Sequence, residues 1–153
     1  MLGKEIRGLL LDVTGVLYNS GEGDGVAISG SVAALSRLQQ QAKYRLRFCS
    51  NESTNTRAHL AAKLTRLGFR DISVEQIFTP PPAVLQILKE RRLRPHLLVH
   101  PDALPEFQSI SGEDPNCVVM GDAQKNFSYN NMNKAFQLLM KLQHPILISM
   151  GLG

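Results

Sequence analysis

Asp12 and the pair Ser50-Asn51 are the residues of this sequence whose types and positions could do chemistry. Asp12 directly follows the apolar run 6–11 (IRGLLL), and Ser50-Asn51 follow a second run, 44–49 (YRLRFC). Short apolar runs that end abruptly in polar residues are typical of strands in parallel sheets. Because ligands bind beyond the carboxyl ends of such strands, we expect these side chains to face one crevice.

Alternating strands and helices must position these residues, which indicates an α/β fold. The first strand, residues 6–11, is expected to be buried on both faces, as in a parallel sheet. A Gly-rich loop at 19–25 follows it, and we interpret its acidic residues Glu22 and Asp24 as part of a solvated flap rather than metal ligands. Further strands are expected at 44–49, from 77–78, and at 96–99, 117–120 and 146–149, and helices at about 31–40, 54–67, 80–94 and 129–142.

Composition excludes several classes of protein. The chain has 153 residues, of which 43% are hydrophobic, enough for a packed core. Its 17 basic and 13 acidic residues give a net charge of +4 without dense Lys/Arg blocks, so we expect no nucleic-acid partner. No apolar run approaches the roughly 20 residues of a membrane span. Cys49 and Cys117 lie in strand-like runs, which favours reduced thiols in the cytoplasm, with Cys49 packed in the core.

The tract 9–18 (LLLDVTGVLY) resembles the first motif of the haloacid dehalogenase superfamily, in which a strand-end Asp attacks phosphorus and forms an aspartyl-phosphate. Ser50, at the end of the next strand, resembles the second motif. The resemblance implies a magnesium-dependent phosphatase with Asp12 as nucleophile, and with Asp12 and Thr14 as Mg²⁺ ligands. The implied substrate-binding residues are Asp12, Val13, Thr14, Ser50 and Asn51.

Longer stretches narrow the resemblance to cytosolic members of the superfamily that carry a large cap: 12–18 (DVTGVLY), 48–53 (FCSNES), 87–95 (ILKERRLRP) and 127–139 (FSYNNMNKAFQLL). It implies an incomplete Rossmann-like parallel-sheet core with the beginning of an inserted α/β cap domain. Residues 1–81 would then form the N-terminal part of the core and residues 82–153 the start of the cap.

The same resemblance implies the substrates: inorganic pyrophosphate, and phosphorus–nitrogen bonds as in phospholysine, phosphohistidine and imidodiphosphate. It implies a cytoplasmic hydrolase without a membrane partner, and it leaves a nuclear pool and a homodimer open.

Two departures from the superfamily pattern stand out. Most of its phosphatases place a second Asp two residues after the nucleophile as general acid, whereas this sequence has Thr14, which cannot donate a proton as a carboxylic acid does. The lysine and the acidic pair of the later motifs are also missing, because the sequence ends at Gly153, after an expected strand. We therefore expect a truncated product whose magnesium site lacks a carboxylate.

Other interpretations stay open. Asp12 alone could be an ordinary strand-end cap, and Ser50-Asn51 a helix-capping pair. The alternative function is a catalytically impaired truncated isoform that acts as a binding or regulatory product. A signalling receiver domain also uses a phosphoacceptor Asp, but it needs that Asp at the end of the third strand, so we set this interpretation aside.

Overall fold

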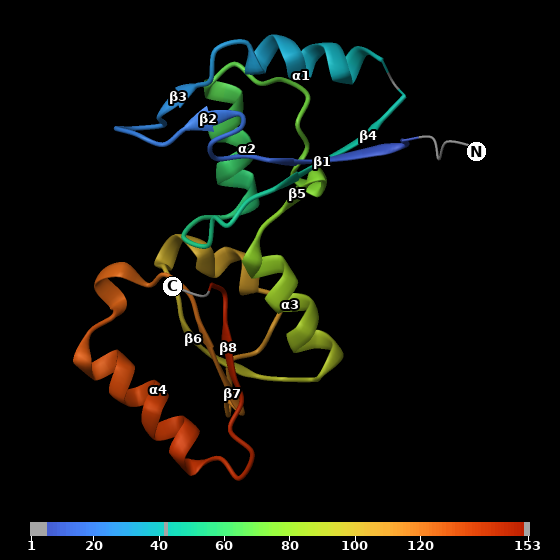
Figure 1. Cartoon of the computed structure of the whole chain (residues 1–153). Helices are drawn as coiled ribbons and strands as arrows, with labels where there is room; N and C mark the ends of the chain where they lie inside the picture. The colour runs from blue at the N-terminus through green and yellow to red at the C-terminus, as the bar shows by residue number, and fades with distance from the viewer. Residues whose placement is uncertain (1–5, 42, 152–153) are drawn as a thin grey trace. The chain divides into compact units, whose positions relative to one another are not determined.

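The computed structural model describes residues 6–41 and 43–151, and these fall into two compact units (Figure 1). The first unit contains the residues up to Ser50 and Arg57–Phe78, and the second contains Asn51–Thr56 and the residues from Thr79 onward. The division into a core part, 1–81, and a cap part, 82–153, stays a prediction, and residues 1–5 and 152–153 of it lie outside the described residues.

The first unit is built on a parallel sheet with strand order β1–β4–β5, and its register pairs Asp12 with Cys49. Strands β2 and β3 form a short antiparallel hairpin on either side of the predicted Gly-rich loop. The elements of this unit are β1 (Gly8–Asp12), β2 (Tyr18–Asn19), β3 (Val26–Ala27), α1 (Ser31–Gln40), β4 (Arg45–Cys49), α2 (Arg57–Arg66), the 3-10 turn η1 (Val74–Gln76) and β5 (Ile77–Phe78).

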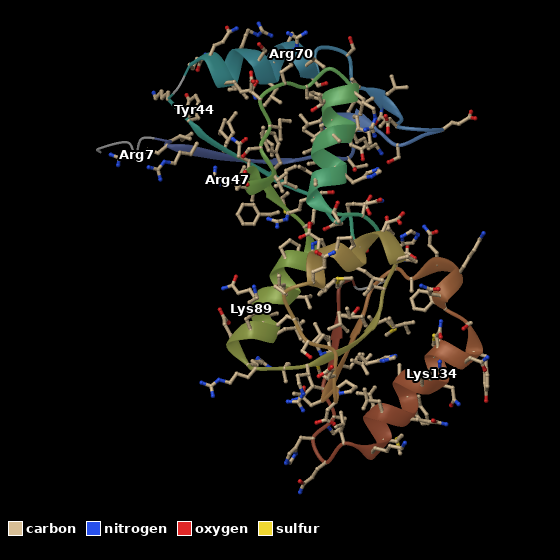
Figure 2. The ribbon with its side chains drawn as sticks, turned by 180° about the vertical axis from the view of Figure 1, so that it is seen from behind. Arg7, Tyr44, Arg47, Arg70, Lys89 and Lys134 are labelled. Atoms are coloured by element: carbon tan, nitrogen blue, oxygen red, sulfur yellow. The ribbon has the colours of Figure 1, made fainter. Side chains whose placement is uncertain are left out.

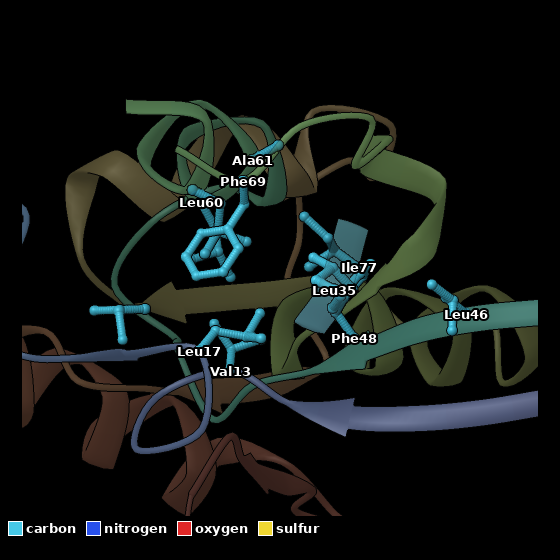
Figure 3. Packing of buried hydrophobic residues seen from close by; sticks show 11 residues of the cluster. Val13, Leu17, Leu35, Leu46, Phe48, Leu60, Ala61, Phe69 and Ile77 are labelled. Atoms are coloured by element: carbon cyan, nitrogen blue, oxygen red, sulfur yellow. The ribbon is translucent and has the colours of Figure 1, made fainter. Parts of the chain in front are cut away.

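One face of this sheet carries the hydrophobic core of the unit (Figure 3). Leu46 and Phe48 alternate with exposed residues along β4 and point into the core. Leu35 from α1 and Leu64 from α2 belong to the same cluster, so both helices cover the same face. Phe48 and Leu64 are fully buried.

The opposite face of the sheet is exposed, which makes the predicted two-sided burial of the first strand wrong. Leu9 and Leu11 pack against the core, but Leu10 is 68% exposed. Cys49 is exposed as well, so its prediction as a core thiol is also wrong. A shallow groove of about 580 Å³ runs over this face, with Leu10, Arg47 and Phe78 among its lining residues (Arg47 is labelled in Figure 2). Helices α1 and α2 both lie on the other face, so apolar side chains remain in contact with water here.

The second unit has a parallel sheet with order β6–β7–β8. Its middle strand is buried on both faces, because Val119 packs with Val84 and Leu88 of α3, while Val118 packs with Ala135 of α4. The elements are α3 (Pro80–Glu90), β6 (Pro95–Leu98), η2 (Pro101–Phe107), β7 (Cys117–Met120), η3 (Gln124–Asn126), α4 (Tyr129–Lys141) and β8 (Leu147–Ser149).

Helix boundaries follow local chemistry. Helix α3 begins with Pro80, as predicted, because proline is tolerated where a helix leaves its first N–H groups unpaired. Helix α2 begins at Arg57 rather than near Thr54, since the Thr54 N–H donates to Glu52 Oε1 and keeps that residue in a local turn. Within the described ranges, no helix is long and apolar enough to cross a membrane.

One face of the first unit's sheet is buried and the other is exposed. Replacing a leucine by alanine should therefore lower the free energy of unfolding by different amounts on the two faces. Leu46→Ala should lower the free energy of unfolding by about 2 to 5 kcal/mol, because it leaves a cavity in the core. Leu10→Ala, on the exposed face, should change it by less than about 0.5 kcal/mol. Chemical denaturation of both variants measures the difference, and equal losses would contradict the one-sided burial of this sheet.

Candidate active site

The carboxyl ends of β1 and β4 bring two of the predicted residues to one edge of the first unit's sheet. Asp12 is the last residue of β1, and it pairs in register with Cys49, the residue before Ser50. The Ser50 N–H donates to the Phe78 carbonyl at 3.0 Å, which holds this strand end against β5. Ser50 is 6% exposed. The structure therefore places Asp12 and Ser50 at the same edge of the sheet, and the crevice expected between them stays a prediction.

The Asp12 carboxylate is exposed and oriented by the backbone. Its Oδ1 accepts a hydrogen bond from the Val13 N–H at 2.8 Å. Val13 itself is fully buried in the core. A carboxylate anchored at one oxygen presents the other in a restricted set of directions, which suits a nucleophile.

A tight turn after Asp12 fixes the residues that follow. The Leu17 N–H donates to the Val13 carbonyl at 2.8 Å, and the Gly15 N–H donates to the Tyr18 carbonyl at 2.8 Å. Gly15 has φ of 84°, a left-handed conformation that glycine adopts without a Cβ penalty. The Thr14 hydroxyl donates to the Tyr18 hydroxyl at 3.3 Å. The Thr14 side chain is thus tied to the turn, which leaves its backbone carbonyl as the group to offer a cation.

The available oxygen atoms are of the kind that magnesium prefers as ligands. Mg²⁺ prefers hard oxygen ligands, and the Asp12 carboxylate and the Thr14 carbonyl are such ligands. Within residues 6–41 and 43–151, no group of three or more His, Cys, Asp or Glu side chains could hold a metal ion. A cation at this edge would therefore need further oxygen ligands besides the Asp12 carboxylate and the Thr14 carbonyl.

One predicted site residue, Asn51, is grouped with the second unit rather than the first. It begins the segment Asn51–Thr56, which is grouped with the second unit, although it follows Ser50 directly in the chain. The structure of the first unit brings together Asp12, Val13, Thr14 and Ser50, and the role of Asn51 in substrate binding stays a prediction.

Thr79 is a residue that the sequence analysis did not single out. It directly follows β5 and is 6% exposed, and its Oγ1 has no hydrogen-bond partner among the described residues. A buried hydroxyl without a partner costs about 1 to 3 kcal/mol, so such groups are often found at functional sites. The sequence could have pointed to Thr79 because it follows a third parallel strand. That strand has only two residues, too few to form a recognisable pattern.

The flap that follows the turn is held by α2. Arg66 donates to both carboxylate oxygens of Asp24, from Nε at 2.6 Å and from an Nη atom at 2.9 Å. Lys63 lies over the Tyr18 ring at 4.5 Å from its centroid. The Arg66 hydrogen bonds hold the pKa of Asp24 below its ordinary value. Asp24 therefore has a structural partner, in keeping with its exclusion as a metal ligand.

Residues 9–113 match the family model of haloacid dehalogenase-like hydrolases. The phospholysine phosphohistidine inorganic pyrophosphate phosphatase of Xenopus laevis is 58% identical over 149 residues, which cover 97% of this chain and 54% of that protein. The chain thus spans about half the length of the curated relatives it matches.

Two solved structures show the same fold. The 4-nitrophenylphosphatase of Thermotoga maritima is similar with a TM-score of 0.76 and 26% identity, over 93% of this chain and 54% of that one. The glycerol phosphate phosphatase of Mycobacterium tuberculosis, solved in complex with magnesium, gives a TM-score of 0.77 over 97% of this chain and 45% of that one. Its 19% identity supports the fold alone.

The ion pair between Arg66 and Asp24 predicts how the flap depends on charge and pH. Asp24→Asn should increase amide hydrogen exchange in residues 19–25 at pH 7, because the variant loses the charge that Arg66 binds. Since the pKa of Asp24 is lowered in the fold, the pair is intact above about pH 4, the ordinary range of Asp, and is lost as the pH falls through the lowered value. The difference between variant and parent should vanish there.

Glu22→Gln is the matched control for this measurement, because it removes a charge from the same loop. It should leave the exchange rates of the loop close to those of the parent. Equal rates in all three proteins at pH 7 would contradict the role of the ion pair in holding the flap.

Proposed function

The chain belongs to the haloacid dehalogenase-like hydrolase family, and we propose that it carries the nucleophilic part of a magnesium-dependent phosphatase centred on Asp12. The observation that carries the proposal is the exposed carboxylate of Asp12, held by the Val13 N–H at the carboxyl end of β1 and in register with the strand that leads to Ser50. Family membership supports the reaction class, and the curated relatives support phosphate-bearing substrates.

The proposed reaction has two steps. A carboxylate oxygen of Asp12 forms a bond to phosphorus, while the bond from phosphorus to the leaving oxygen or nitrogen breaks and its electron pair departs with the leaving group. Water then attacks the aspartyl-phosphate, which releases inorganic phosphate and regenerates the carboxylate. When bound at the Asp12 and Thr14 oxygens, Mg²⁺ would offset the negative charge that otherwise repels the nucleophile.

The remaining site residues orient the substrate. Ser50 and Asn51 offer a hydroxyl and an amide to the phosphate oxygens, and the Val13 N–H restrains the nucleophile. Thr14 stands where many relatives of this family use a carboxylic acid, and its hydroxyl already donates to Tyr18. The reaction therefore suits leaving groups that need little protonation help, namely phosphate from pyrophosphate or a protonated nitrogen from phospholysine or phosphohistidine.

A second candidate is a binding or regulatory role without turnover. The exposed face of β1, β4 and β5 favours it, because an apolar groove on a parallel sheet is the kind of surface that another protein segment covers. One experiment distinguishes the two candidate functions. Phosphate release is measured for the 153-residue chain and for a chimera in which residues 1–153 replace the matching half of the Xenopus laevis relative.

Asp12→Asn tests the nucleophile in that chimera. The amide has the shape of the carboxylate but cannot attack phosphorus, so magnesium-dependent release of phosphate from pyrophosphate should fall more than about a thousandfold with an unchanged melting temperature. Activity above a few per cent of the parent would remove Asp12 from this role. The second candidate gains support for the 153-residue chain if the chimera is active and the chain alone is not.

Thr14→Ser tests whether the backbone or the side chain of Thr14 matters. Serine keeps the hydroxyl that donates to Tyr18 and the carbonyl proposed to bind magnesium, so the chimera should retain most of its activity and its magnesium dependence. A steady-state titration with Mg²⁺ measures both quantities. Loss of activity at normal magnesium affinity would show that the threonine methyl group has a role that this proposal omits.

A further inference from the structure

The exposed face of the first unit's sheet carries a groove of about 580 Å³ that lies wholly within that unit. Its lining comes from β1, β4 and the end of β5, and it is apolar at Leu10, Cys49 and Phe78. Leu10 is 68% exposed and Phe78 is 53% exposed, because α1 and α2 both pack on the opposite face. Faces of parallel sheets are ordinarily covered, so this face is a surface where a further element can dock.

The shape of the groove suits an α-helix. Neighbouring strands lie about 4.8 Å apart, so three strands present a strip about 10 Å wide, which matches the diameter of a helix with its side chains. The five residues of β1 extend over about 16 Å, the length of about three helical turns. Gly8 has no side chain, and a Cβ atom there would lie only 3.3 Å from the Arg45 carbonyl oxygen, so the floor at this end stays bare. A helix of about three turns can therefore lie along the strip.

Two arginines make the groove basic. Arg45 and Arg47 project from alternate positions of β4 to this exposed face, and among the described lining residues none is acidic. Arg47 donates from an Nη atom to the carbonyl of its neighbour Leu46 at 2.9 Å. No ion pair between described residues includes either arginine. Positive charges of this kind beside an apolar strip favour a helix that has acidic residues next to its apolar stripe.

Charge also distinguishes another protein from a second copy of this chain as the occupant. The described helices α1 to α4 contain a single acidic residue, Glu90, the last residue of α3. Helix α4 does expose an apolar stripe, formed by Tyr129, Met132, Phe136 and Met140. Its charged residues are Lys134 and Lys141, which would meet the two arginines of the groove with like charge. A helix of a second copy therefore does not fit the groove.

We propose that the groove docks an acidic amphipathic helix of another protein. The apolar stripe of that helix covers Leu10 and Phe78, and its carboxylates contact Arg45 and Arg47. The proposal names the chemistry of the partner in the binding role described above as the second candidate function. It does not depend on the phosphatase reaction, because no lining residue of the groove belongs to the candidate active site.

A stapled helical peptide of about 14 residues, with leucines on one face and glutamates beside them, tests the groove in the 153-residue chain. The staple keeps the probe helical, so weak binding cannot be ascribed to its unfolding. In fluorescence anisotropy titrations it should bind at least about fivefold more tightly than the same peptide with glutamines in place of glutamates, because the glutamine peptide lacks two exposed ion pairs. In NMR titrations the glutamate peptide should shift the amide signals of Leu10, Arg47 and Phe78.

Variants of the chain assign the contacts. Arg45→Gln combined with Arg47→Gln should weaken binding of the glutamate peptide at least about fivefold and remove its advantage over the glutamine peptide. Arg37→Gln combined with Arg70→Gln is the matched control, because it removes the same charge from exposed positions of the same unit outside the groove (Arg47 and Arg70 are labelled in Figure 2). The control should bind as the parent does. Leu10→Ala should weaken both peptides by the same factor, because it removes an apolar contact that does not depend on charge.

Two results would overturn the acidic partner: equal affinity for the glutamate and glutamine peptides, or an unchanged affinity in the variant that lacks both groove arginines. A chain that is dimeric by analytical ultracentrifugation and becomes monomeric in Leu10→Asp would overturn it as well, because a second copy then covers the groove. Asp12→Asn should leave peptide binding unchanged. Failure of the nucleophile assignment in the chimera therefore leaves this surface intact, and loss of peptide binding leaves the phosphatase proposal intact.

Discussion

The parallel pairing of β1 with β4 is the interaction on which the candidate active site depends. Its register sets Asp12 opposite Cys49, so that the residues after both strands leave the sheet at one edge. A shift of one residue would turn every side chain of β1 to the other face and would bury Leu10 in place of Leu9 and Leu11. The buried side chains that fix the register therefore also fix the nucleophile, although none of them touches a substrate.

Much of the fold could be predicted from the sequence, because local patterns define strands and helices. The expected helix at 31–40 and the expected strand at 117–120 have the bounds that the structure shows. The faces of the first strand could not be predicted. A run of three leucines does not encode which side helices will cover, and both helices of the first unit cover the same side. The burial expected for Leu10 and Cys49 failed for this one reason.

The residues of the candidate site also divide into those that could be predicted from the sequence and those that could not. Asp12 and Ser50 could be found because each follows an apolar run directly, and the structure places both at one sheet edge. Thr79 was missed because its strand has two residues, too few for a pattern.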